Sequence, residues 1–190
     1  MYFKKICGKK CYLSPLDLND AEKYTEWLND HEVIKFMPTF SGMITTLKEK
    51  ETMQEISKNH NYSIISIKNN ELIGSCGLNT VNHLHQTAEI GIFIGNKKYW
   101  NDGYGTEAIQ LLLDYGFKIL NLHNINVTVH SENIRAIKLF EKIGFKLIGN
   151  RREAFIQGNK KYDIILMDIL FEEFYYKNKF DINEERTNSA

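Results

Sequence analysis

The spacing of hydrophobic residues changes several times along the chain, and each change predicts a new element. Apolar side chains recur every three to four residues in segments 18–30, 45–60, 108–119 and 132–144, which predicts amphipathic helices. Elsewhere they form short runs that are rich in β-branched residues or alternate with polar ones, as in strands. Seven such runs occur, at 9–15, 62–68, 71–81, 87–95, 124–130, 145–152 and 160–170.

Turn residues separate these elements and fix their order. Asn69–Asn70 stands between the second and third strands, and Gly158–Asn159 stands between the last two, so both pairs are predicted hairpins. The order is β, α, α, three β, a loop, then α, β, α, β, β, which predicts a single α+β domain over residues 1–175. Its sheet is expected to be mixed but mostly antiparallel, with seven strands and helices on both faces. The polar residues 176–190 are expected to form a frayed tail.

The composition narrows the classes of function. Lys and Arg total 24 and Asp and Glu total 24, so the net charge is zero and no overall basic field is available for nucleic acid. No apolar run approaches the roughly 20 residues of a membrane span, and the N-terminus lacks a signal peptide, so a cytoplasmic protein without a membrane partner is expected. The three cysteines, Cys7, Cys11 and Cys76, lack further ligands at zinc spacing, so no metal site is expected.

The segment YWNDGYGTEA, residues 99–108, places two glycines at the start of a predicted helix, where anions bind well. A nucleotide P-loop is disfavoured because Gly105 is not followed by Lys and Ser or Thr. Gly103, Gly105 and Ala108 satisfy the dinucleotide-binding spacing, and Glu132 follows at a suitable distance. That motif, however, belongs after the first strand of a long alternating sheet, and only one further helix follows here. A helix-start turn without any ligand is a third interpretation.

The order of the surrounding segments favours a fourth interpretation. The strand EIGIFIG precedes the loop, and a helix, the strand NINVTVH and the segment NIRAIKLFEKIGF follow it. Over residues 2–171 the chain resembles the GNAT superfamily of N-acetyltransferases, whose core holds a loop Q/R-x-x-G-x-G/A and a later segment N-x-x-A-x-x-L/Y/F-Y/F-x-x-x-G-F. Trp100 replaces the usual Gln or Arg, which is typical of the ribosomal-protein N-terminal acetyltransferase (RimJ/RimL-like) branch. The last hairpin, GNRREAFIQGNKKYDIILMDIL, also resembles bacterial spermidine acetyltransferases.

This resemblance implies acetyl-CoA as the co-substrate, and the chemistry of the loop agrees with it. Consecutive backbone N–H groups from Asp102 to Thr106, together with the helix dipole, can bind a pyrophosphate without a lysine. Glycine lets the backbone approach the phosphates closely. The residues expected to contact the cofactor are Ile92, Phe93, Ile94, Trp100, Asn101, Asp102, Gly103, Tyr104, Gly105, Thr106, Asn133 and Phe140.

The resemblance also assigns roles outside the loop. In the family two strands splay apart, and the pantetheine amides pair with the backbone of the first one, which implies Ile92, Phe93 and Ile94 here. Asn133 matches the family asparagine that hydrogen-bonds the pantetheine arm, and it also suits a helix N-cap. Basic residues that can add contacts to the adenosine phosphates are Lys97, Lys98, Arg135, Lys138 and Lys142.

For catalysis, the family chemistry is direct attack of an amine on the thioester. Glu89 lies at the start of the strand before the loop, where many relatives place the carboxylate that takes the proton from the ammonium. The usual acids are absent, because the tyrosine position is Phe140 and the serine position is Ala136. Departure of an unassisted thiolate, or protonation by water, is then expected. Side chains that could substitute for the acid are Ser131, His130, Tyr99 and Tyr104.

The acceptor amine is expected opposite the cofactor, against the early helices and the last hairpin. Acidic groups there are Glu26, Asp30 and Glu32, and apolar walls are Trp27, Phe36, Met37, Phe40 and Phe155. A protein N-terminus, a polyamine, an amino sugar or an antibiotic all fit these features, and a homodimer is one option for the assembly. An N-acetyltransferase is therefore the main prediction, and a non-catalytic acyl-CoA-binding module is the alternative.

Overall fold

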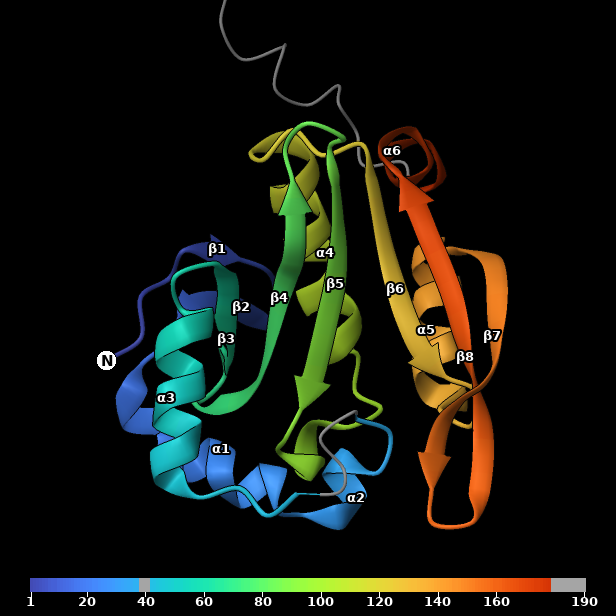
Figure 1. Ribbon diagram of the computed structural model, residues 1–190. Coiled ribbons are helices and arrows are strands. Elements are labelled where there is room, and N and C mark those ends of the chain that lie inside the picture. Colours follow the sequence, from blue (N-terminus) through green and yellow to red (C-terminus); the bar gives the residue numbers. More distant parts are fainter. Residues whose placement is uncertain (38–41, 179–190) are drawn as a thin grey trace, which may run out of the picture.

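A computed structural model describes residues 1–37 and 42–178 and is built around one sheet (Figure 1). The order of its strands is β1-β2-β3-β4-β5-β6-β8-β7, and all neighbours are antiparallel except β5 and β6, which run parallel. The strands are β1 (Ile6–Cys7), β2 (Cys11–Pro15), β3 (His60–Ser66), β4 (Leu72–Asn82), β5 (Thr87–Ile94), β6 (Asn124–His130), β7 (Lys146–Gln157) and β8 (Lys160–Leu170). The predicted α+β class and mixed sheet are confirmed.

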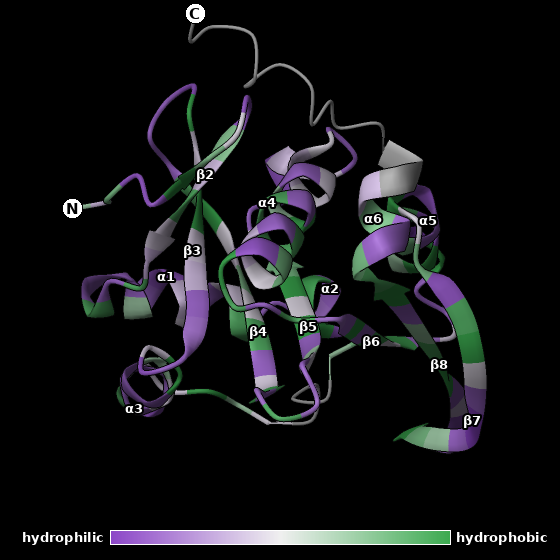
Figure 2. Cartoon of the chain, turned by 90° about the horizontal axis from the view of Figure 1, so that it is seen from above, coloured by the Kyte–Doolittle hydropathy of each residue, from purple (hydrophilic) through white to green (hydrophobic). Residues whose placement is uncertain are grey.

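Helices cover both faces of this sheet, as expected from the sequence (Figure 2). On one face α4 (Tyr104–Lys118) and α5 (Ile134–Ile143) bury their apolar sides in the larger core cluster. On the other face α1 (Ala21–Leu28) and α3 (Thr46–Ile56) pack over a smaller cluster. Two short helices, α2 (His31–Ile34) and α6 (Phe171–Asn178), and two 3₁₀ turns, η1 (Leu18–Asp20) and η2 (Lys97–Tyr99), complete the described elements.

The structure differs from the prediction at the ends of the chain and of one helix, and it contains the short helices α2 and α6, which were not predicted. The sheet has eight strands instead of seven, because Ile6–Cys7 pairs with β2 as a short edge strand. Helix α6 extends three residues into the segment 176–190 that was expected to be frayed, and residues 179–190 lie outside the described part of the chain. Ile119 follows the end of α4 and is 69% exposed, so it does not continue the apolar face of that helix.

The sheet opens between its two parallel strands. Only Thr87, Ala88 and Glu89 of β5 have partners on β6, namely Asn124 to Asn126. Beyond Glu89 the two strands diverge toward α2 (Figure 1), while β5 continues to pair with β4 and β6 continues to pair with β8. Backbone groups of β5 that face away from β4 therefore have no neighbouring strand over Gly91–Ile94. The splayed arrangement that the resemblance implied is present at the predicted strands.

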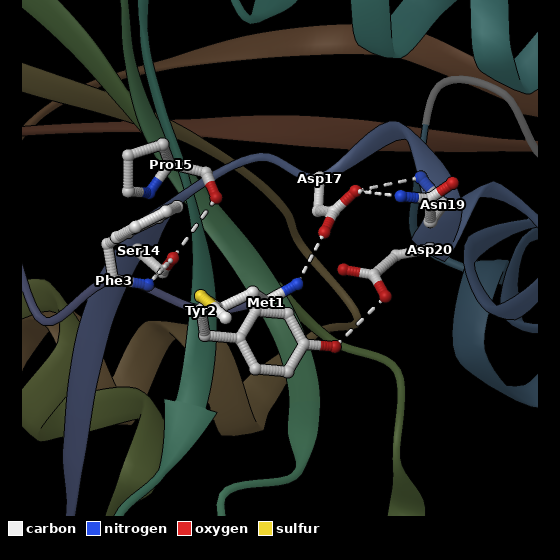
Figure 3. Close-up of polar contacts among 8 residues, drawn as sticks. All are labelled: Met1, Tyr2, Phe3, Ser14, Pro15, Asp17, Asn19 and Asp20. Atoms are coloured by element: carbon white, nitrogen blue, oxygen red, sulfur yellow. Dashed lines mark hydrogen bonds and ion pairs between the residues drawn. The ribbon is translucent and has the colours of Figure 1, made fainter.

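The first residues of the chain are tied to the start of the α1 region (Figure 3). The Met1 amino group lies 2.9 Å from Asp17 Oδ2, and the Tyr2 hydroxyl donates to Asp20 Oδ1 at 2.9 Å. Farther along, α1 lies against the end of β5, where the Trp27 ring is so close to Gly95 that a Cβ atom there would overlap the indole. Across the described residues, every helix is too short or too polar to span a bilayer.

Glu107, in the first turn of α4, holds the hairpin between β1 and β2. Its carboxylate accepts backbone N–H groups from Lys9 at 2.8 Å, Lys10 at 2.7 Å and Cys11 at 2.8 Å. Burial raises the pKa of Glu107, but these hydrogen bonds to the ionised form outweigh it and the net pKa is lowered. A Cβ atom at Gly8 would come within 2.7 Å of Glu107 Cδ, so a larger residue there would displace this carboxylate.

A Glu107→Gln variant is expected to lose about 1–2 kcal/mol of unfolding free energy near neutral pH, because an amide oxygen accepts these three N–H groups less strongly. A carboxylate with a depressed folded-state pKa stabilises the fold above the ordinary glutamate pKa of about 4.3, and this contribution disappears as pH falls through the folded value. Urea unfolding at neutral pH and below about pH 4 checks both statements. The exposed Glu51→Gln is the control, and an equal loss at both pH values would contradict the assignment.

Candidate active site

A cavity of about 940 Å³ occupies the opening between β5 and β6. It is lined from one side by the residues after η2 and the start of α4, from another by β6 and α5, and from a third by α2 and the residues that follow it. Ten of the twelve residues predicted to contact the cofactor line this cavity, namely Ile92, Phe93, Ile94, Trp100, Asn101, Gly103, Gly105, Thr106, Asn133 and Phe140.

The glycine loop starts α4 without a side-chain cap. Gly103 is the N-cap residue with φ of 80°, in the left-handed region that favours glycine, and no side-chain hydrogen bond caps this helix start. Asn101 also has a positive φ, 60°. The first N–H groups of α4 therefore face the cavity beside Gly103 and Gly105, with the positive end of the helix dipole behind them. This is a cradle that fits a pyrophosphate.

Two aromatic residues brace the loop against the strands. The Trp100 indole N–H donates to the Ile94 carbonyl at 2.7 Å and so ties the loop to the end of β5. The Arg135 guanidinium stacks 4.1 Å from the centre of the same indole, which links the loop to α5. Below the loop, the Tyr99 hydroxyl donates to Glu71 at 2.7 Å. Trp100 is thus a bracing residue as well as a cavity wall.

Lys10 contacts the glycine loop, and two predicted loop residues turn their side chains away from the cavity. Lys10 Nζ donates to the Asp102 carbonyl at 2.6 Å and lies 3.9 Å from the position of a Cβ atom at Gly103. The Asp102 side chain points to this lysine and the Tyr104 ring is buried in the core, so neither side chain lines the cavity and only their backbone is placed for an anion. No sequence signal marked Lys10, because it is distant in the chain.

Asn133 and Phe140 lie on α5 facing the cavity. Asn133 is the N-cap of α5, and its Oδ1 accepts the Ala136 N–H at 3.2 Å, as the alternative interpretation of this asparagine expected. Phe140 is 3% exposed, lines the cavity and packs edge-on against Phe145. Neither Phe140 nor Ala136 carries a proton that could be given to a thiolate.

Glu89 lies where the two parallel strands begin to separate, on the sheet face away from α4 and α5. It does not itself line the cavity, but the Thr128 hydroxyl donates to Glu89 Oε1 at 2.6 Å, and Thr128 does line it. The carboxylate is therefore connected to the cavity through one hydroxyl. Sequence reasoning did not find Thr128, because its only signal is a position two residues from the end of a strand.

His130 follows Thr128 on the same face of β6, since alternate residues of a strand share a face. It is 4% exposed and lines the cavity, and its Nδ1 accepts the Glu132 N–H at 3.1 Å. Burial lowers the pKa of this imidazole more than Glu132 raises it. The ring is surrounded by aromatic side chains, with centroids 5.1 Å from Phe36, 4.6 Å from Phe155 and 4.7 Å from Tyr162.

The other candidate acids and nucleophiles are less well placed. Tyr99 is hydrogen-bonded to Glu71 and Asn69, and Tyr104 lies in the core, so their hydroxyls are occupied or remote. Ser131 follows β6 and is not among the described residues that line the cavity. Cys76 lines the cavity but is buried, and burial raises the pKa of its thiol, which makes it a weak nucleophile.

The acidic residues predicted for the acceptor side form ion pairs with lysines. Lys97 pairs with Asp30 at 2.7 Å and with Glu32 at 2.9 Å, and Glu26 pairs with Lys23 on exposed α1. Of the predicted apolar walls, Phe36 and Met37 line the cavity. Trp27 points from α1 into the smaller core cluster, and Phe155 packs on His130. Phe40 lies outside the described residues.

Comparison with known proteins gives the same family from sequence and from structure. Residues 10–146 match the family model described as an acetyltransferase (GNAT) domain. The chain is 30% identical over 168 residues to the "uncharacterized N-acetyltransferase p20" of Bacillus licheniformis, which covers 85% of this chain and 93% of the relative.

Two solved structures are similar over almost the whole chain. A GNAT-family acetyltransferase from Bacillus anthracis has 31% identity and a TM-score of 0.79, covering 91% of this chain and 100% of the other. The spermidine N-acetyltransferase of Vibrio cholerae, in complex with CoA and spermine, has 26% identity and a TM-score of 0.79, covering 88% and 99%. Together with the matched domain, these similarities show that the chain belongs to the GNAT family of acetyl-CoA-dependent N-acetyltransferases.

Proposed function

We propose that the protein transfers the acetyl group of acetyl-CoA to a primary amine of a small molecule or a peptide, with Glu89 as the base. One observation carries this proposal. The opening between β5 and β6 connects an uncapped helix start, suited to a pyrophosphate, with a carboxylate that reaches the same cavity through Thr128. An anion site and a base on one cavity are what direct acetyl transfer requires.

The proposed cofactor site uses backbone groups more than side-chain charge. The first N–H groups of α4 bind the pyrophosphate, and Lys10 and Arg135 add positive charge beside the loop. Backbone groups of Ile92 to Ile94 that face away from β4, other than the Ile94 carbonyl that Trp100 binds, extend the sheet toward the pantetheine amides. Acetyl-CoA supplies an activated thioester with a thiol leaving group whose pKa of about 8.5 allows departure without an acid.

The acceptor loses its proton along the contact between Thr128 and Glu89. An alkylammonium has a pKa near 10, so it is almost fully protonated at neutral pH and has no free lone pair. The Thr128 oxygen accepts the ammonium proton while its own hydroxyl proton passes to Glu89 Oε1, 2.6 Å away. The neutral nitrogen then forms a bond to the thioester carbon and the carbon–sulfur bond breaks. The excess proton on the new amide nitrogen passes through water to the departing thiolate, and Glu89 releases its proton to solvent.

Two observations bear on which amine is the acceptor. The similarity to spermidine N-acetyltransferases supports a small amine. Trp100, by contrast, is typical of the ribosomal-protein N-terminal acetyltransferase branch, which supports a peptide α-amine. Both classes present a primary amine to the same base.

The test is release of CoA thiol from acetyl-CoA across a panel of amines that holds a polyamine, an amino sugar, an alkylamine and peptide amides. Saturable turnover with at least one amine is expected, with kcat between about 1 and 1,000 per second for the preferred one. Tight CoA binding by calorimetry without turnover on the whole panel would favour the non-catalytic acyl-CoA-binding module instead. The Arg152→Gln variant, which lies outside the cavity, serves as the activity control.

A further inference from the structure

His130 holds a hydrogen-bond donor that has no partner in the protein. Because Nδ1 accepts the Glu132 N–H at 3.1 Å, the neutral ring carries its proton on Nε2. His130 Nε2 is fully buried, and no acceptor binds it among residues 1–37 and 42–178. The flanking rings of Phe36, Phe155 and Tyr162 offer only weak π acceptors. An unpaired buried donor is destabilising and rare in folded proteins, which points to a partner that the protein itself does not supply.

The position of this donor is on the acceptor side of the site. His130 is two residues beyond Thr128 on the same face of β6, which places it about 7 Å along the strand from the hydroxyl that faces the amine. Both residues line the cavity, as does Phe36, which covers the imidazole from the side of α2. A molecule whose amine lies at Thr128 can therefore reach Nε2 with another atom if it moves the Phe36 ring aside.

Building on the proposed function, we infer that His130 Nε2–H donates to an oxygen atom of the acceptor, about 7 Å from the amine that is acetylated. The residue then determines specificity. The acceptor carries a carbonyl or hydroxyl oxygen at that spacing, as in the second carbonyl of a peptide or the far hydroxyl of an amino sugar. A polyamine does not satisfy this donor, because its nitrogens at neutral pH carry protons and donate.

The charged residues that line the cavity also favour an acceptor with polar oxygens over a polyamine. The carboxylates among its described lining residues are Glu32, which pairs with Lys97, and Glu132. The basic lining residues are Lys35, Arg135, Lys138 and Lys142. The acceptor side is instead lined by neutral polar groups from Asn61, Ser75, Asn79 and Thr128. A polycation finds few free carboxylates here, whereas a singly charged amine with polar oxygens meets suitable donors and acceptors.

The test compares δ-aminovaleramide with pentylamine, and adds spermidine. The first two have five carbon atoms each and similar amine basicity, and they differ in that a terminal carboxamide replaces a methyl group. For the wild-type enzyme we expect kcat/KM to favour the amide by about 5- to 100-fold. His130→Phe, which keeps an aromatic ring in place, should reduce this ratio to near one, because kcat/KM falls more for the amide than for pentylamine. Tyr162→Phe removes a hydroxyl from the same ring cluster and should leave the ratio as it is.

Several results would overturn the inference. One is that His130→Phe leaves the ratio of the two kcat/KM values unchanged. Another is that the wild type prefers spermidine to the amide. A third is that His130→Phe changes the KM for acetyl-CoA and not the ratio for the acceptors. Calorimetric binding of the two amines to the CoA complex gives the same comparison without turnover. A protein that binds the amide through His130 but transfers no acetyl group contradicts the proposed function alone.

Discussion

Replacing Glu89 by Gln is expected to lower kcat/KM for the preferred amine by about 100- to 10,000-fold, the usual contribution of a positioned base. The amide keeps the size of the side chain and still accepts the Thr128 hydroxyl, but it cannot take up a proton. Because Glu89 lies outside the cavity and away from the loop, the dissociation constant for CoA should stay the same. Steady-state kinetics and calorimetry measure the two quantities.

Matched variants separate this role from a general loss of structure. Glu22→Gln changes an exposed carboxylate on α1 and should leave activity and stability as they are. Thr128→Val, which removes the hydroxyl but keeps the shape, should lower kcat about tenfold, and Thr128→Ser should restore most of it. If Glu89→Gln retained activity, or if serine at position 128 failed to rescue, the proton path through these two residues would be wrong.

Replacing Gly103 by Val is expected to weaken CoA binding by about 10- to 100-fold. A Cβ atom at this position has space, since its nearest neighbour would be Lys10 Nζ at 3.9 Å. The backbone is the difficulty, because φ is 80° and a β-branched residue is strained there by about 1–3 kcal/mol. The chain relieves this strain by turning φ negative, which rotates the N–H groups of the helix start away from the cavity.

The control for this variant is Gly158→Val. Gly158 also has a positive φ, 59°, with nothing within 4 Å of a Cβ atom, but it lies in the turn between β7 and β8. Both variants should lower the melting temperature, and only Gly103→Val should change the dissociation constant for CoA, measured by calorimetry. Unchanged CoA affinity in a folded Gly103→Val protein would contradict the assignment of this loop.

Local patterns in the sequence were sufficient for the elements that carry the site. Hydrophobic periodicity predicted α1, α3, α4, α5 and most of the strands, but not the short helices α2 and α6. Turn residues such as Asn70 and Gly158 predicted the hairpins, because a turn depends on residues a few positions apart. The short β1 was missed because two residues are too few for a pattern. Ile119 was misplaced because apolar spacing does not show where a helix ends.

Side-chain direction in the candidate site needed the structure. Tyr104 stands in the middle of the glycine loop, yet its place in the first turn of α4 directs the ring into the core instead of the cavity. The Asp102 side chain points to Lys10, which lies in a hairpin near the start of the chain. Sequence spacing identified the loop, but it could not distinguish residues that offer a backbone N–H group from those that offer a side chain.

By itself the sequence determined the order of strand, glycine loop and helix, and with it the backbone cradle at Gly103, since such a cradle requires only neighbouring residues. The tertiary structure decided the contacts between distant segments. Thr128 reaches Glu89 because β5 and β6 are in register up to Asn126 and then diverge. His130 keeps an unpaired donor because Phe36, from the segment after α2, and two rings of the last hairpin close around it. Such contacts depend on strand register and packing, which no local pattern encodes.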